Sequence, residues 1–128
     1  MESNMKDTQF QQKIDEHKLW IDSSGELGSR ADFTGSFLCS ANLSGLNLSG
    51  AIFHGVNMYG ANLCGSDLTG ADFTGADLGS AEARKANLRG AILKGADFSD
   101  ADLRGSDLEG AVTDGARFDS AKLTTEAA

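Results

Sequence analysis

The sequence predicts an all-β fold in which most of the chain winds into a four-sided coil, preceded by one α-helix. Three observations predict it. A five-residue repeat runs from Ala31 to Thr125, glycine recurs at the end of most units, and Phe33, Phe53 and Phe73 lie twenty residues apart. Short internal repeats are typical of solenoids. We therefore expect an N-terminal segment (1–30), one repeat domain (31–125) and a short tail (126–128).

The repeat has a defined residue type at four of its five positions. In nineteen units, the first residue is Ala in fourteen, the second Asp or Asn in twelve, the third Leu, Phe or Met in seventeen, and the fifth Gly in thirteen. In an extended strand the first and third side chains point to one side, and the second and fourth to the other. The first and third positions are therefore expected to be buried, and the second to face solvent.

Each unit must also contain a corner. If the strand ran on straight, the large apolar residue of the next unit, five positions later, would point outward. Glycine accepts the positive φ that tight turns require, so the corner is expected at the fifth position. Asp and Asn can accept hydrogen bonds from turn backbone, which gives the second position a structural role.

The spacing of the phenylalanines indicates how many units close one coil. Phe98 and Phe118 are also twenty residues apart, and no two inward phenylalanines are separated by fifteen. Four units per coil fit better than three. The nineteen units then form 4.75 coils, which rise roughly 23 Å at about 4.8 Å per rung. The expected product is a short rod with a filled interior.

These residues bring the chain to a known family. The pattern of a small residue, Asp or Asn, Leu or Phe, any residue and often Gly strongly resembles the pentapeptide-repeat proteins over residues 31–125. The resemblance implies a right-handed quadrilateral β-helix, and the handedness comes from the family alone. It says little about function, because the repeat is a scaffold on which different functions are built.

Residues 1–30 do not follow the repeat and are expected to form a capping helix. Thr8 and Gln11 fit a capping box at its start, and Ser23–Gly25 are expected to end it. Solenoids need a cap over their terminal coil, and Trp20 is the favoured residue to plug it. The alternative is that the helix docks on a partner. The residues that follow helical spacing on one face are Phe10, Ile14, His17 and Ile21, with Trp20 beside them.

The other end of the rod is expected to form a dimer interface. The residues after Leu123 are few and polar, so Phe118, Leu123 and unpaired backbone groups of the last coil would be left uncovered. An uncovered rung invites pairing with another chain. We therefore expect a homodimer through the C-terminal coil, which the resemblance to gyrase-protecting members also implies.

Few residues suggest chemistry. Of the two histidines, His17 lies in the helix and His54 at an outward fourth position, and both fit surface or capping roles. Cys39 and Cys64, also at fourth positions, lack metal-site spacing and are interpreted as exposed thiols.

A cluster of aspartates does not form a calcium loop. Asp97, Asp100 and Asp102 are close in sequence, but the rest of the loop pattern is missing. A filled rod offers no interior pocket, so we expect no enzyme, no cofactor and no metal.

Composition excludes several other classes. Nineteen acidic against eleven basic residues give a net charge of −8, which disfavours nucleic acid as a direct partner. The sequence has no apolar run long enough to span a membrane and a polar N-terminus. A cytoplasmic location is expected, where both cysteines stay reduced.

The outward surface offers a candidate protein-binding face. Ile52, Ile92 and Val112 occupy second positions of one side, where Asp or Asn is usual, and Phe37 and Tyr59 project from the adjacent side. Regular apolar surface can mark a binding face, although single exposed apolar residues are common. Both interpretations stay open.

Two function hypotheses follow. The first is a non-enzymatic scaffold that binds another protein through its flat sides. The alternative is a DNA mimic that binds a type II topoisomerase such as gyrase, as the family resemblance suggests. It would use the acidic residues of a stretch that has no base, 31–83, which are Asp32, Asp67, Asp72, Asp77 and Glu82.

Three features of the sequence speak against the mimic. The five acids are spread over all four sides of the expected coil. Bases gather in the second half, at Arg84, Lys85, Arg89 and Arg104. The register of the repeat is also unbroken, whereas gyrase-protecting relatives interrupt the coil with loops.

Overall fold

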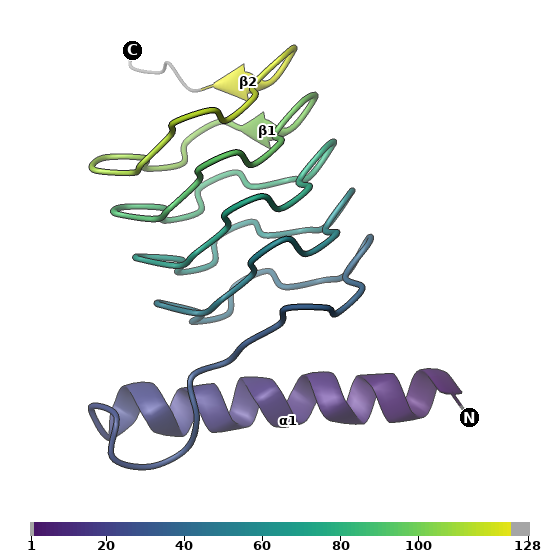
Figure 1. Cartoon of the computed structure of the whole chain (residues 1–128), viewed down its shortest axis with the longest axis vertical. Coiled ribbons are helices and arrows are strands. Elements are labelled where there is room, and N and C mark those ends of the chain that lie inside the picture. The colour runs from purple at the N-terminus through teal and green to yellow at the C-terminus, as the bar shows by residue number, and fades with distance from the viewer. Residues whose placement is uncertain (1, 124–128) are drawn as a thin grey trace.

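The structure is a computed structural model that describes residues 2–123, with side chains from residue 8 onward. Its first element is helix α1 (Glu2–Asp22), which lies across the base of a stack of coils (Figure 1). Two short strands, β1 (Asp102–Leu103) and β2 (Lys122–Leu123), pair in parallel near the C-terminal end of the stack. The rest of the stack is built from single-residue parallel bridges.

The bridges confirm four units per coil. Every one joins a residue to the residue twenty positions later, as in Asp32 with Ile52 and Ile52 with Asp72. Backbone hydrogen bonds flank each bridge: Phe33 N–H donates to Ile52 O at 2.8 Å, and Ile52 N–H donates to Ala31 O at 2.9 Å. Coils therefore stack in register along the rod.

Four flat sides result, and we number them in chain order. Side 1 begins with unit 31–35, side 2 with 36–40, side 3 with 41–45 and side 4 with 46–50, and each side adds the unit twenty residues later on every coil. Sides 1 and 3 lie opposite each other, as do sides 2 and 4.

Fifth-position residues form the corners, as the sequence predicts. From residue 35 to residue 120 every fifth position has a positive φ. Glycine is the residue at most corners, and only Lys85, at φ 60°, places a long side chain there.

Second-position Asp and Asn residues hold the corners in shape. All twelve of them accept a hydrogen bond from the backbone N–H two residues later, as Asp32 Oδ1 does from Thr34 N–H at 2.9 Å. The predicted structural role of this position is therefore confirmed.

The interior is filled by columns of like side chains. Phe33, Phe53 and Phe73 form a stack with ring centroids 5.0 and 4.8 Å apart, and Phe98 stacks on Phe118 at 5.4 Å. Leucines fill the neighbouring columns and are buried as far as Leu103, whereas Leu108 is half-buried. Ala83, which replaces a large third-position residue, is also fully buried.

Helix α1 starts earlier than its sequence signals suggest. It begins at Glu2 and runs through Thr8, so the predicted capping box at Thr8 and Gln11 is wrong. A capping box is a weak local signal, and the helix continues through it. The end is as predicted: Gly25 N–H donates to Trp20 O at 2.8 Å and Ser24, at φ 57°, donates to Ile21 O at 3.1 Å, which is a Schellman motif.

Candidate functional site

Helix α1 joins the first coil through a buried histidine. His17 is completely buried. Its Nδ1 accepts a hydrogen bond from Ala31 N–H at 2.9 Å, so its Nε2 is the atom that donates to Ser49 O at 2.8 Å. Burial is the main cause that lowers the pKa of His17. The hydrogen bond to Ser49 raises this pKa, and the nearby Arg30 charge lowers it further. The ring is therefore a neutral clamp between two chain segments.

Phe10 covers the end of the core, rather than Trp20. The Phe10 and Phe33 ring centroids are 5.9 Å apart, and Ile14 also packs against the buried cluster. Trp20 instead lies at the edge of the coil, where it stacks on His17 at 5.3 Å and its ring atoms approach Gly50. This corrects the choice of Trp20 as the plug. Ile21 lines a surface hollow beside Trp20.

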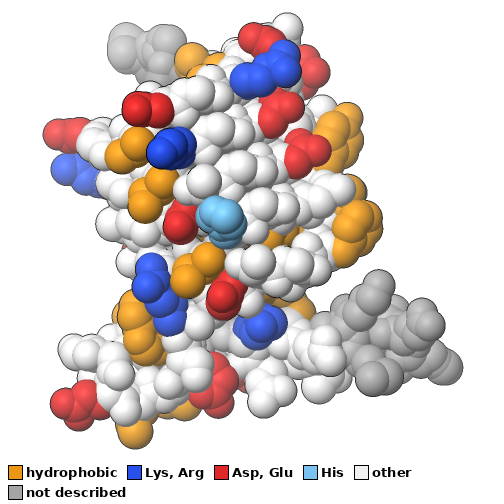
Figure 2. All heavy atoms as spheres, viewed as in Figure 1, with side chains coloured by type: hydrophobic (Ala, Val, Ile, Leu, Met, Phe, Trp, Pro, Cys, Tyr) orange, Lys and Arg blue, Asp and Glu red, His pale blue; other side chains and the backbone are white. Residues whose placement is uncertain are grey.

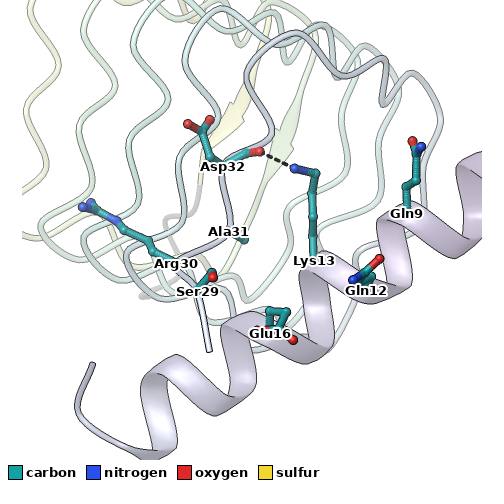
Figure 3. A pocket seen from close by; sticks show the side chains of 8 residues that line it. All are labelled: Gln9, Gln12, Lys13, Glu16, Ser29, Arg30, Ala31 and Asp32. Carbon is teal, nitrogen blue, oxygen red and sulfur yellow. Dashed lines mark hydrogen bonds between the residues drawn. The ribbon is translucent and has the colours of Figure 1, made fainter. Parts of the chain in front are cut away.

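A hollow of about 380 Å³, lined mostly by polar residues, lies between one part of α1 and the start of the first coil (Figure 3). Lys13 reaches across it and donates to Asp32 O at 3.0 Å. Arg30 extends away from Lys13, donates from Nε to Gly50 O at 2.7 Å, and places its guanidinium 5.7 Å from the Trp20 ring centroid. Because both cations bind backbone carbonyls of the coil, this hollow is a structural joint.

The apolar residues predicted for side 1 form one column, which is interrupted by one acid, Asp72. Ile52 and Ile92 are half-buried, and Val112 is 42% exposed. The bridges place Asp72 between Ile52 and Ile92, and put Val112 next to Ile92. On the face that Figure 2 presents, hydrophobic side chains likewise lie in small groups among charged ones.

Side 2 carries the most exposed aromatic rings of the stack. Phe37 is 69% exposed and Tyr59 on the next coil is 51% exposed. The Tyr59 ring lies over Gly79, where an added Cβ would be 3.0 Å from a ring carbon, and its hydroxyl meets Ser80 Oγ at 3.3 Å. The ring is therefore held flat against the side, and the absence of a side chain at position 79 makes room for it.

Phe37 borders a hollow of about 280 Å³ at the corner between α1 and side 2, which is lined by both apolar and polar side chains. Phe10, Phe33 and Leu38 contribute to its wall. Side 2 thus presents two rings and a small recess, and it is the better candidate for binding an apolar side chain.

The residues of the predicted dimer end differ in exposure. Phe118 is half-buried against Phe98, and Leu123 is 49% exposed. Residues 124–128 lie outside the described residues, so the predicted homodimer through this coil stays a prediction.

The acids of the alternative function are tied to the fold. Asp32, Asp67, Asp72 and Asp77 each accept a corner N–H. The two hydrogen bonds from Thr34 lower the pKa of Asp32. Glu82 instead lies 3.8 Å from Arg84.

The thiols and possible metal ligands are dispersed. Cys39 and Cys64 are unpaired and half-buried, rather than exposed as predicted, because Cys39 Sγ packs 3.5 Å from Asn57 Oδ1 and Cys64 lies in a recess below Arg84. Among the described residues no group of three His, Cys, Asp or Glu side chains could hold a metal ion. No helix within residues 2–123 is long and apolar enough to cross a membrane.

Comparison with known proteins gives the family. The model of the pentapeptide repeats matches residues 29–63, 57–95, 71–110 and 96–124 in eight copies. No curated protein matches the sequence.

Several solved structures share the fold. HetL, a pentapeptide repeat protein involved in heterocyst differentiation regulation from the cyanobacterium Nostoc sp. strain PCC 7120, is 33% identical with a TM-score of 0.67 over 69% of this chain and 43% of HetL. AT2G44920, from the Arabidopsis thaliana thylakoid lumen, is 32% identical with a TM-score of 0.65 over 66% and 59%. The protein alr5209 from Nostoc PCC 7120 is 27% identical with a TM-score of 0.57 over 84% and 92%.

This chain therefore spans less than two thirds of HetL and of AT2G44920. Homology gives it the pentapeptide-repeat fold, a right-handed quadrilateral β-helix, here with one N-terminal helix. The repeat pattern, the twenty-residue pairing and the family match agree, and the chain belongs to the pentapeptide-repeat family.

Proposed function

We propose that this protein is a non-enzymatic scaffold that binds another protein through its flat sides. One observation carries the proposal: side 2 exposes Phe37 and Tyr59 on successive coils, and Phe37 stands beside a small recess. Aromatic residues of this kind are enriched at the centres of protein interfaces.

The geometry of Tyr59 suits an interface. Its ring rests on Gly79 and its hydroxyl meets Ser80, so little side-chain freedom remains to be lost on binding. Burying a large apolar side chain contributes about 1.5–3 kcal/mol. The two rings together could therefore supply a large share of a moderate affinity.

The rest of the molecule supports binding over catalysis. The interior is filled by fully buried side chains, from Phe33 to Leu103, and the hollows described above lie at the surface. Catalysis needs polar groups that converge in a concave site.

A capture experiment tests the proposal. We expect the wild-type protein, used as bait in its source cell, to retain a specific protein that Phe37→Ser/Tyr59→Ser loses. Leu27→Ser is the matched control, because Leu27 is 61% exposed but lies outside the coil. Ile52→Asp/Ile92→Asp tests side 1 in the same way. Equal capture by wild type and the side 2 variant would refute the assignment of the surface.

The gyrase alternative has weaker support. Four of its five acids already hold corners, and the five lie on four different sides. Duplex DNA carries one charge per about 1.7 Å along its axis, a density that acids dispersed around a rod do not present to one partner. A supercoiling assay with gyrase, with and without the protein, tests this alternative directly.

A further inference from the structure

The charges of the coil are segregated by side. Sides 1, 2 and 4 are net acidic, with more Asp and Glu than Lys and Arg on each. Side 3 is the exception within the described coils, with the acids Glu82 and Asp102 against four bases, which are Arg84, Lys85, Arg104 and Lys122. A cationic strip therefore runs along one side of a protein whose net charge is −8.

These cations are only partly neutralised within the molecule. Arg104 is neutralised by Asp102, to which it donates from Nε at 2.9 Å and from Nη2 at 2.7 Å. Arg84 makes only long contacts, at 3.8 Å to Glu82 and 3.9 Å to Asp102, which are too long for hydrogen bonds. Lys85 Nζ has no hydrogen-bond or ion-pair partner among the described residues. Elsewhere on the described coils, Arg89 and Arg117 are paired with acids, and Lys94 on side 1 has no partner among the described residues.

Three of the four cations on side 3 line a recess. Cys64, Arg84, Arg104 and the corner residues Gly65, Lys85 and Gly105 surround a shallow hollow of about 580 Å³. The side chain of Lys85 lies along Gly105, with its Cγ 3.2 Å from where a Cβ would stand. Glycine on either side of Lys85 in this corner column leaves room for an incoming group.

We propose that side 3 binds a short acidic segment of a protein partner, with Arg84 and Lys85 receiving its carboxylates in this recess. The inference rests on the proposed scaffold function and adds the chemistry of a partner. Arg104 with Asp102 shows the two-point contact that an arginine on this side makes with a carboxylate. The ion pairs of Arg84 are longer than hydrogen bonds, so its guanidinium can make the same two-point contact with an incoming carboxylate.

A carboxylate segment fits better than a nucleic acid. The strip covers only the coils that hold residues 84–122, and acidic sides border it on both edges. A phosphate backbone extends well beyond such a strip and would meet the surrounding negative charge. One or two carboxylates match the small excess of positive charge.

The test is an NMR titration of the full chain with hexaglutamate at low ionic strength, about 10 mM, where screening is weak. We expect saturable amide shifts centred on residues 84, 85, 104 and 105. Arg84→Gln/Lys85→Gly should weaken binding by about tenfold or more, because charge-assisted hydrogen bonds are lost. The matched control, Arg89→Gln/Lys94→Gln, changes the net charge equally and should bind nearly as wild type.

Three results overturn the inference: no saturable shifts with the wild-type protein, shifts centred on another side, or equal weakening in both double variants. None of them touches the capture experiment on side 2. Conversely, a capture experiment that shows no role for Phe37 and Tyr59 would not change the result of the hexaglutamate titration. The two proposals can therefore fail separately.

Discussion

Replacing His17 by leucine removes the clamp between helix α1 and the first coil. Leucine fills much of the space but leaves the N–H of Ala31 and the C=O of Ser49 buried without their partners. Each unsatisfied buried group costs about 1–3 kcal/mol. We therefore expect the attachment of α1 to lose about 2–5 kcal/mol, after some relaxation of the loop.

Lowering the pH perturbs the same clamp in the wild-type protein. The pKa of His17 is lowered in the folded state, chiefly by burial, while in the unfolded chain it returns to about 6.5. The unfolded state therefore binds the proton first as pH falls. The stability that the clamp contributes is complete above about pH 6.5 and declines as the pH drops from there toward the lowered pKa. Protonated Nδ1 would face the Ala31 N–H, donor against donor.

Trp20 makes the experiment specific, because it is the single tryptophan and stacks on His17. Urea unfolding is followed by two signals. Trp20 fluorescence reports the detachment of α1 from the first coil, and circular dichroism reports the unfolding of the whole protein. For His17→Leu the fluorescence midpoint should fall by about 1–2 M urea, and the decline of this midpoint as the pH falls below about 6.5 should disappear. His54→Leu, an exposed histidine, is the control. Wild-type midpoints in His17→Leu would refute the reasoning.

Two further predictions concern the corners and side 2. Lys85→Gly should stabilise the protein by about 1 kcal/mol, because a left-handed φ of 60° is unfavourable for lysine, and urea unfolding measures it; a loss of stability would contradict this. Gly79→Ala should destabilise by about 1 kcal/mol through its clash with the Tyr59 ring. Most of that cost should disappear in a Tyr59→Ala background, and a persisting cost would mean that the contact with Asp77 Oδ1, 3.1 Å from the added Cβ, is responsible.

The coil could be predicted from the sequence because its information is local and repeated. The Phe33, Phe53 and Phe73 column follows from the period, and the same arithmetic places Ile52 against Asp72. The corner residues follow from the need for positive φ. Each unit states the same geometry again, so single departures such as Ala83 do not obscure it.

The joint with α1 could not be predicted in the same detail. Its geometry depends on the packing of one loop: a Cβ at Gly28 would lie 2.6 Å from the Cβ of Leu19, and Ser29 N–H donates to Glu16 O at 3.1 Å. This closely packed loop fixes the orientation of the helix, in which Phe10 and His17 face the coil and Trp20 lies at its edge. The spacing of His17 with Phe10 and Ile14 was the available signal for its burial.

Each residue pairs with the residue twenty positions later, so the side and the coil on which a residue lies depend on the number of residues before it. Deleting one complete coil, such as 51–70, would bring Phe33 beneath Phe73 and leave every later residue on its own side. Deleting only 66–70 would leave each later residue at its inward or outward position in the repeat. It would, however, move all later units to the neighbouring side of the rod. Arg84 would then stand in the column of Tyr59, and a basic aromatic face would replace a separate cationic strip. Length changes in multiples of five thus rearrange this surface while preserving the fold.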